Sequence, residues 1–496
     1  MSYGSPVAAS ESGPIGPQVA TDAVRDGVAR RRAAHPDEPR YASLAAAVED
    51  AISSGVLADG AKLPAERDLV AALRLSRTTV SRAYARLEQG GWLERRVGSG
   101  TFARRPDPQA GRVWLRDVID GAPRRRGERR SGMINLTSSR PFVLGAGLRE
   151  ALGRSAEAVE AVAEQLQYAT QGLPELRETV AAAYTARGLP TTAEQVLITS
   201  GAQQALGLVL QLYVRPDDPV AVESPTYHGA LDALRVRQAR PVAIDADPAT
   251  VAEQLAAVAE HVPLRAAYLM TTCHAVTGRV VGAAQRRALA ELSLERQLPL
   301  IEDDILAGLT FAEGAAAAEA PPVAAYAEDA PIFTIGSTSK LVWNGLRVGW
   351  LRAPEALLVR LARLKGTADL GTSLVAQLVA GQLLVHADDL ARRRREENAA
   401  AFAHAATLLE RHLPAWRWTP PEGGRSLWVR LPEDGPDGPA VAQAAVRHGV
   451  SVIAGPTFAA DGRHRHRLRL MPVRPPERLA EGVARLSAAW DELQGP

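Results

Sequence analysis

Short apolar runs alternate with helical patterns from Met133 onward, and this alternation constrains the fold more than any other feature of the chain. The runs have the length and composition of strands buried on both faces, and they occupy residues 196–198, 219–222, 240–244, 266–270, 299–301 and 332–335. Helical patterns, such as residues 201–213 and 283–295, lie between them. The alternation predicts an α/β fold with a mostly parallel sheet and helices on both faces.

The pattern changes beyond residue 380. A long helical stretch over about residues 391–411 precedes apolar runs at residues 426–430, 450–453 and 467–470. We therefore expect a large domain over residues 132–380 and a smaller C-terminal α/β domain over residues 381–496.

One lysine follows the run at residues 332–335 in a small, hydroxyl-rich turn. Residues 336–340 read Gly-Ser-Thr-Ser-Lys, and Arg347 comes shortly afterwards. A lysine can form a Schiff base with an aldehyde, while hydroxyl groups and an arginine suit a phosphate. An aldehyde and a phosphate on one ligand indicate pyridoxal 5′-phosphate (PLP). The alternative interpretation is a surface lysine after a strand.

Other polar segments also follow predicted strands, where sites of such sheets lie. Residues 199–203 read Thr-Ser-Gly-Ala-Gln and open a helix, which makes an anion site. Residues 225–227 read Pro-Thr-Tyr and can place an aromatic ring over a flat cofactor. Residues 302–304 read Glu-Asp-Asp, and a buried carboxylate beside a pyridine nitrogen keeps that nitrogen protonated. Adjacent acids can equally form a capped loop or a structural ion pair.

The order of these segments resembles the fold-type I aminotransferases from about Ile134 to Pro496. The resemblance implies that Lys340 forms the internal aldimine, that Asp303 pairs with the pyridine nitrogen and that Tyr227 stacks on the ring. It also implies that the residues that hold the phosphate are Ala202, Gln203, Ser337, Ser339 and Arg347.

The same resemblance implies two further contacts. Tyr168 reaches the phosphate of the partner subunit, and Arg469 clamps a substrate carboxylate through its planar guanidinium. For Arg469 the alternative is a solvated charge at the edge of a strand.

The chain departs from the family pattern at two positions. The family has Asn-Pro-Thr-Gly, or His-Gln-x-Pro-Thr-Gly, where residues 274–278 read His-Ala-Val-Thr-Gly, and it has a tyrosine near Leu306. Ala275 and Leu306 therefore replace donors to the phenolic oxygen of the cofactor, although His274 can reach this oxygen if the loop is shifted. Each lost hydrogen bond to a charged oxygen costs about 1.5–3 kcal/mol. We expect weaker PLP binding and inefficient transamination, and loss of PLP altogether stays open.

The sequence pattern before residue 132 differs from the one described above, and a block of short helical patterns begins at Tyr41. Apolar residues at helical spacing predict three short helices, Ser76 can cap the third, and residues 92–94 and 98–102 form two short extended pieces around a basic turn. Three helices followed by a hairpin predict a winged helix-turn-helix over residues 41–103.

This block resembles the DNA-binding domain of GntR-family bacterial repressors. The matching strings are Leu-Pro-x-Glu-Arg-x-Leu, Ser-Arg-x-Thr-Val-x-x-Ala-Tyr-x-x-Leu, Gly-Trp-Leu and Gly-Ser-Gly-Thr-Phe. The resemblance implies that the major groove faces Arg67, Arg77, Thr78, Thr79 and Arg82. It implies that Gly100 and Thr101 approach the minor groove at the wing tip. Arginine can pair bidentately with guanine, whereas Thr78 and Thr79 can also be ordinary residues of a first helical turn.

The remaining segments are polar. Residues 1–40 are rich in Pro, Gly, Ser and Ala and predict a disordered arm, and residues 104–131 predict a basic linker. The net charge of +2 gives no overall attraction to nucleic acid. One cysteine, and the absence of a signal peptide or an apolar run of membrane-spanning length, favour a cytoplasmic protein without membrane contact.

A GntR-like winged helix joined to an aminotransferase-like domain is similar to the MocR-type regulators. The resemblance implies a homodimeric transcription factor that reads paired half-sites of an operator and senses PLP or a small amino compound. A catalytically competent aminotransferase with a DNA-binding module is the alternative. A third possibility is a regulator whose vestigial pocket senses another ligand.

Overall fold

The computed structural model describes residues 17–34, 39–53, 57, 60–89, 92–96, 100–104, 132–138, 146–166, 168–311 and 320–494. The chain divides into two compact units, Met1–Arg112 and Val113–Pro496. Nearly all of the predicted linker, residues 105–131, lies outside the described residues. Among the helices that are described, none has the length and apolar character needed to cross a membrane.

The first unit is a small helical bundle with a hairpin. Its elements are α1 (Pro17–Ala34), α2 (Arg40–Ser53), α3 (Glu66–Leu73), α4 (Arg77–Gln89), β1 (Leu93–Arg96) and β2 (Gly100–Ala103). Leu69 of α3 and Val80 of α4 are fully buried in the common core, and β1 pairs antiparallel with β2. Helices α2 to α4 and the hairpin agree with the predicted winged helix-turn-helix.

Helix α1 corrects the expectation of a disordered arm over residues 1–40. Val24 and Val28 lie four residues apart on one helical face, and both are buried in the core of this unit. Gly27 permits close packing, since a β-carbon there would lie 3.2 Å from the Ala47 β-carbon of α2. Among the residues of α1 whose side chains are described, these two valines carry the apolar period, and so short a pattern did not indicate a helix. Residues 1–16 lie outside the described part of the chain.

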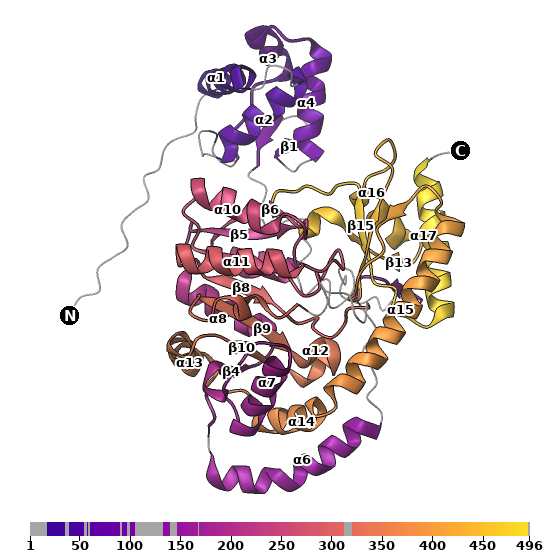
Figure 1. Ribbon diagram of the computed structural model, residues 1–496. Coiled ribbons are helices and arrows are strands. Elements are labelled where there is room, and N and C mark those ends of the chain that lie inside the picture. The colour runs from indigo at the N-terminus through magenta and orange to yellow at the C-terminus, as the bar shows by residue number, and fades with distance from the viewer. Residues whose placement is uncertain are drawn as a thin grey trace, which may run out of the picture. The chain divides into compact units, whose positions relative to one another are not determined.

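A seven-stranded sheet organises the second unit (Figure 1). The strands in spatial order are β4 (Val196–Thr199), β10 (Gly349–Arg352), β9 (Ile332–Ser337), β8 (Leu300–Asp303), β7 (Ala266–Leu269), β5 (Pro219–Ser224) and β6 (Arg240–Asp245). β10 is antiparallel to both neighbours, and the other pairs are parallel. The six apolar runs predicted between residues 196 and 335 are all strands of this sheet. The sequence pattern did not indicate β10, because this strand is short and ends at Arg352, a charged residue that is buried here.

Helices cover both faces of this sheet, as predicted. One apolar cluster joins the strands to α7 (Pro174–Ala186), α10 (Val251–His261), α11 (Ala283–Arg296) and α14 (Leu374–Leu384). The other cluster joins them to α8 (Ala202–Tyr213), α9 (His228–Val236) and α13 (Glu355–Asp369). Neighbouring strand residues such as Leu197 and Ile198 belong to opposite clusters, as the pleat requires. α6 (Ala146–Gln165) packs on α14, and the one-turn helix α12 (Thr338–Leu341) follows β9.

A smaller α/β layer follows in sequence. α15 (Ala387–His412) extends from α12 to this layer, whose antiparallel sheet has the order β11 (Arg417–Trp418), β12 (Leu427–Arg430), β15 (Arg467–Leu470), β14 (Ile453–Ala454) (Figure 1). Its remaining helices are α16 (Gly438–Arg447) and α17 (Pro476–Gln494). The early strand β3 (Ile134–Asn135) pairs in parallel with β13 (Val450–Ser451), so residues from the start of the unit complete this layer.

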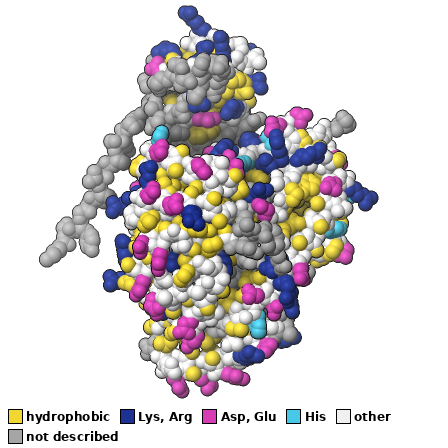
Figure 2. All heavy atoms as spheres, viewed as in Figure 1, with side chains coloured by type: hydrophobic (Ala, Val, Ile, Leu, Met, Phe, Trp, Pro, Cys, Tyr) yellow, Lys and Arg dark blue, Asp and Glu magenta, His cyan; other side chains and the backbone are white. Residues whose placement is uncertain are grey.

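The visible surface of the second unit mixes both signs of charge. Figure 2 shows basic and acidic side chains interspersed over this unit, as expected from the overall charge of +2. Any selectivity for anions must therefore come from local clusters of charge.

Candidate functional site

The turn that carries Lys340 is held by hydrogen bonds of its own hydroxyl groups. The Ser337 hydroxyl accepts from the Ser339 amide at 3.1 Å and donates to the Ser339 hydroxyl at 2.9 Å. The Thr338 hydroxyl donates to the Val348 carbonyl at 2.8 Å. These bonds give the turn one defined shape at the carboxyl edge of the sheet, where α/β proteins place their ligands.

The Lys340 amine lies among charged groups. Its pKa is lowered to about 8, first because burial removes water from the amine and then because Arg425 and Arg469 repel its charge. Asp303 acts in the opposite direction. An amine with this pKa is unprotonated in a useful fraction of molecules near neutral pH. Lys340 is therefore a better nucleophile toward an aldehyde than a fully exposed lysine.

Asp303, at the end of β8, is buried and well supplied with donors. The Tyr268 hydroxyl donates to one carboxylate oxygen, and the Ile305 amide donates to the other at 3.1 Å. Burial raises the pKa of Asp303 to about 6, while these two hydrogen bonds oppose the shift. Such a carboxylate can accept a further bond from a protonated ring nitrogen. The sequence pattern did not single out Tyr268, which sits inside an ordinary apolar strand.

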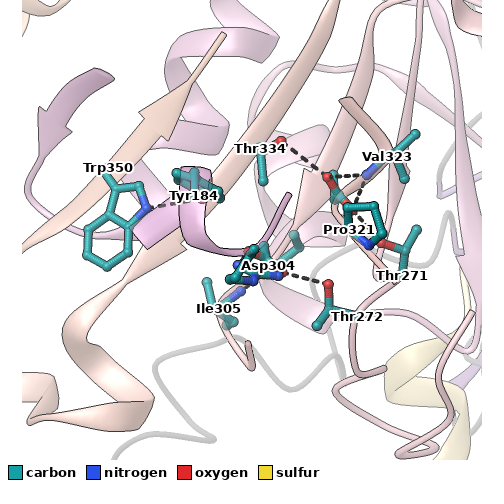
Figure 3. A network of polar contacts seen from close by, with 12 residues as sticks. Tyr184, Thr271, Thr272, Asp304, Ile305, Pro321, Val323, Thr334 and Trp350 are labelled. Carbon is teal, nitrogen blue, oxygen red and sulfur yellow. Dashed lines mark hydrogen bonds and ion pairs between the residues drawn. The ribbon is translucent and has the colours of Figure 1, made fainter. Parts of the chain in front are cut away.

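The flanking acids of the Glu-Asp-Asp segment point away from the central one. Glu302 accepts from the Thr271 hydroxyl at 2.5 Å, and Asp304 accepts from the Thr272 hydroxyl at 2.6 Å and from both terminal nitrogens of Arg187 at 2.5 and 3.0 Å (Figure 3). Side chains alternate along a strand, so these two acids share one side. The segment thus combines a structural network with one carboxylate on the lysine side.

The segment before α8 forms a close-fitting loop. Gly201 has φ +116°, a conformation that favours glycine, and an added β-carbon there would lie 2.5 Å from a terminal nitrogen of Arg347. Arg347 donates to the Ser200 carbonyl at 2.8 Å. Ala202 opens the helix, and Gln203 donates to the Gly229 carbonyl at 2.8 Å, whereas its buried side-chain oxygen has no hydrogen-bond partner. The structure therefore brings an arginine and a helix N-terminus together, as an anion requires.

Tyr227 is at the start of α9. Its ring meets that of His228 edge-on at 5.0 Å, and Gly229 leaves it room, because a β-carbon there would lie 2.5 Å from the ring. Burial raises the pKa of Tyr227, and so does the nearby charge of Asp303. The ring thus belongs to the same cluster as the carboxylate.

Arg469 is buried in β15 and is not a solvated strand-edge charge. One terminal nitrogen donates to the Thr137 carbonyl at 2.7 Å, and the guanidinium carbon lies 4.6 Å from the centre of the Phe458 ring. Its buried Nε has no hydrogen-bond partner. Burial lowers the pKa of Arg469 to about 10. A carboxylate would satisfy a guanidinium in this state.

His274 shapes its own loop. Its Nε2 lies 3.0 Å from the Pro225 carbonyl, and its Nδ1 accepts from the amides of Val276 and Thr277 at 3.2 and 3.1 Å. Both ring nitrogens are therefore engaged by backbone groups, contrary to the use of this ring as a cofactor donor. Leu306, near the position where the family has a tyrosine, is buried in a small apolar cluster and supplies no hydrogen-bond donor.

Tyr168 lies on the surface of the second unit. Its side chain is 65% exposed. An exposed position is compatible with the predicted contact to a partner subunit, which stays a prediction.

The residues predicted to read DNA lie on α3, α4 and the hairpin. Arg67 and Arg77 are exposed near the starts of their helices. The Thr79 amide donates to Ser76 Oγ at 3.1 Å, which caps α4, and Thr78 is exposed. The guanidinium of Arg82 lies 4.1 Å from the centre of the Tyr41 ring.

Gly100 and Thr101 open strand β2 of the wing. Gly100 has φ +114°, and a β-carbon there would lie 2.9 Å from the Lys62 side chain. The end of the Lys62 side chain can move aside, so it is the positive φ that favours glycine at this point, whatever its part in binding DNA.

Two family models match the chain. The model for aminotransferase class I and II covers residues 132–486, and the model for bacterial regulatory proteins of the gntR family covers residues 40–103. The first of these matches lies within the unit that carries Lys340, and the second lies within the unit that carries α2 to α4 and the wing.

Curated relatives include regulators and enzymes. The uncharacterized HTH-type transcriptional regulator YdcR of Escherichia coli is 31% identical over 445 residues, which are 85% of this chain and 92% of that protein. The 2-aminoadipate transaminase of Thermus thermophilus is 33% identical over 339 residues, which are 66% of this chain and 82% of the enzyme.

Solved structures agree with this relationship. The α-aminoadipate aminotransferase LysN of Thermus thermophilus, complexed with N-(5′-phosphopyridoxyl)-L-leucine, matches with a TM-score of 0.67 and 28% identity, over 78% of this chain and 97% of that one. The guanidinium of Arg347 beside the N-terminus of α8, the close-fitting loop at Gly201 and the lowered pKa of Lys340 fit the same cofactor, PLP. The chain therefore belongs to the MocR-type transcriptional regulators of the GntR family, in which a winged helix-turn-helix is joined to a PLP-dependent aminotransferase-like domain.

Proposed function

We propose that this protein is a transcriptional regulator whose aminotransferase-like domain senses PLP, an amino compound, or both. The observation that carries the proposal is the Lys340 amine, which has a lowered pKa and lies near Asp303, in a chain that also carries a DNA-binding domain. A ligand that binds one closure state of the domain more tightly than another shifts the population of that state. Transcription would then change because the shift alters where the DNA-binding domains are placed.

The residues of the site have separate tasks toward the cofactor. When bound, PLP supplies an electron-withdrawing ring and an aldehyde, and the aldehyde condenses with amines. Lys340 supplies the amine that holds this aldehyde, and Asp303 keeps a proton on the ring nitrogen. Tyr227 covers one face of the ring.

The phosphate would have a set of donors near the start of α8, at the end of β9 and on α12. The backbone amide of Ala202, at a helix N-terminus, and the guanidinium of Arg347 face it, and the hydroxyls of Ser337 and Ser339 complete the set. Gln203 contributes to the shape of this loop through its bond to the Gly229 carbonyl.

In the family, an asparagine and a tyrosine donate hydrogen bonds to the phenolic oxygen of PLP, and this chain has neither donor. Ala275 and Leu306 cannot donate hydrogen bonds, and both ring nitrogens of His274 are engaged by the backbone. Each missing bond costs about 1.5–3 kcal/mol. We infer that PLP is held less tightly than in an enzyme with both donors and that turnover is slow, which favours sensing over catalysis.

The DNA-reading residues follow from the helix-turn-helix. Arg77 and Thr78, exposed in the first turn of α4, reach base edges, and Arg67 at the start of α3 lies within reach of the same groove. A homodimer would bring two such domains to paired half-sites and would place Tyr168 next to the partner's phosphate.

A catalytically competent aminotransferase is the second candidate. Lys340, Asp303 and Tyr227 are all retained, and a transaminase is among the relatives at 33% identity. Single-turnover and steady-state assays with amino donors decide between the two. A turnover of about 1 s⁻¹ or more, as in ordinary enzymes, would exclude a purely sensory role.

The first experiment is an absorbance spectrum of the full chain with and without added PLP. A band at roughly 420 nm is expected from the lysine-bound cofactor. Lys340→Ala should lose this band, and Lys62→Ala, in the other unit, should keep it. A protein that stays colourless with excess PLP would support a vestigial pocket for another ligand and would refute the proposal.

A further inference from the structure

A network of polar side chains joins the end of α13 to the start of α8. Lys365 is fully buried, and its Nζ lies 2.7 Å from Oδ1 of Asp369, one helical turn later. The other oxygen of this carboxylate, Oδ2, accepts from Nε2 of Gln204 at 2.7 Å and from the Ser200 hydroxyl at 3.5 Å. The roles assigned above to the cofactor site use neither Lys365, Asp369 nor Gln204. We call these three residues the Asp369 network.

The Asp369 network holds the residue that precedes the close-fitting loop before α8. The Ser200 amide donates to Oε1 of Gln204 at 2.8 Å, while the Ser200 hydroxyl donates to Asp369. The Ser200 carbonyl accepts from Arg347 at 2.8 Å. Every polar group of Ser200 is therefore held, and Gly201 with its φ of +116° follows directly. The place of this turn depends on the network as well as on the arginine.

The charge of Asp369 fixes which way round the Gln204 amide lies. Partial burial raises the pKa of Asp369, but hydrogen bonds from Gln204 and Lys365 lower it by more, so that this pKa lies below its usual value. Asp369 is therefore ionised at neutral pH and can only accept hydrogen bonds. Gln204 must turn its NH2 group toward Asp369, which leaves its oxygen for the Ser200 amide.

Lys365 balances the charge that Asp369 brings to this part of the molecule. A lone carboxylate next to the turn would repel an anion bound there, and this repulsion would be strong where water is scarce. The ammonium group of Lys365 cancels it, because it lies in direct contact with the carboxylate and is fully buried. A buried lysine is costly without such a partner. The pair thus supplies a strong acceptor for Gln204 and adds no net charge.

We propose that Asp369, neutralised by Lys365, is a positioning residue for the phosphate of PLP, which acts through Gln204 on the turn at Ser200 and Gly201. The inference rests on the proposed function, in which this turn and the N-terminus of α8 bind that phosphate. Asp369 does not itself contact the cofactor. A network that merely packs α13 against α8 would affect every ligand of the site alike, whereas a positioning network acts on ligands that carry a phosphate.

The test compares PLP with pyridoxal, which has the same ring and aldehyde and no phosphate. The cofactor-free full chain is titrated with each, and the band at roughly 420 nm is followed. The double variant Lys365→Met/Asp369→Leu removes both charges together, so that neither is left buried without a partner. Its PLP concentration for half-saturation should rise about tenfold, as for a lost charge-assisted hydrogen bond, and its value for pyridoxal should change by less than about threefold.

Two more variants guard against a folding defect. Gln204→Met keeps the buried ion pair and breaks only the connection to Ser200, and it should show the same selective loss for PLP. Arg363→Met changes an exposed arginine of α13, and it should bind both ligands as the wild type does. Equal losses for PLP and pyridoxal in the two network variants would assign the network to helix packing and would overturn the inference.

Inorganic phosphate separates this inference from the proposed function. A wild-type chain that forms no band with PLP, yet binds phosphate in calorimetry with an affinity that falls about tenfold in the network variants, would refute PLP sensing and support the network. A wild-type band whose PLP titration is unchanged in both network variants would support PLP binding and overturn the inference. A chain that binds neither PLP nor phosphate would overturn both.

Discussion

The pH dependence of PLP loading follows from the surroundings of Lys340. With its pKa lowered from 10.5 to about 8, about a tenth of the molecules carry a neutral amine at pH 7, against about one in 3,000 for an unperturbed lysine. The rate at which the roughly 420 nm band appears after mixing with PLP should therefore rise with pH and reach half of its maximum near pH 8.

The sign of the shift can be tested with one substitution. Arg425 repels the charge of Lys340, so Arg425→Met should favour the protonated amine and move the half-maximum to higher pH. Arg363→Met, on the surface of α13, should leave it in place. Ionisation of free PLP contributes equally to all three proteins and cancels in the comparison. A wild-type half-maximum near 10.5, or a downward movement in Arg425→Met, would refute the electrostatic reasoning.

Three further substitutions test other parts of the structure. Arg77→Ala should weaken specific operator binding about 10- to 100-fold in gel-shift assays on DNA selected from a random library, with the absorbance band intact. Arg86→Ala, at the far end of α4, should retain specificity. Unchanged affinity in Arg77→Ala would exclude Arg77 from base reading. Gly201→Ala should raise the PLP concentration for half-saturation about tenfold, because φ +116° and the close approach of Arg347 oppose a β-carbon. Gly207→Ala, inside the helix α8 that follows, meets no atom within 4 Å and should behave as wild type. Equal titrations of the two variants would contradict a close-fitting loop. Val24→Ala should lower the free energy of unfolding of the first unit by about 2 kcal/mol, which would be seen as faster hydrogen exchange of α2 amides in the full chain. Arg32 is exposed, so Arg32→Ala should leave the exchange unchanged. Identical exchange in the two variants would mean that α1 adds nothing to this core.

The sequence predicted the parts of the fold that have a regular pattern. The alternation of apolar runs identified the parallel strands, and the position of Lys340 after one of them identified the lysine turn. These features are local, because a buried strand must be apolar on both faces and a turn must carry small polar residues.

The parts that the sequence did not predict depend on contacts between distant segments. β10 ends in a buried arginine, Arg352, which no local rule assigns to a strand interior. β3 pairs with β13 across most of the unit, and Tyr268 reaches Asp303 from the neighbouring strand. The same holds for Arg425 and Arg474, which line one pocket only in the folded chain.

The pairing of β3 with β13 also bears on how a signal can leave the domain. Asn135 and Thr137, whose carbonyls hold Arg474 and Arg469, come almost directly after the chain that arrives from the DNA-binding domain. Under the proposed function, a ligand that moves Arg469 would also move the Thr137 backbone to which this arginine is hydrogen-bonded, a few residues after the end of the predicted linker.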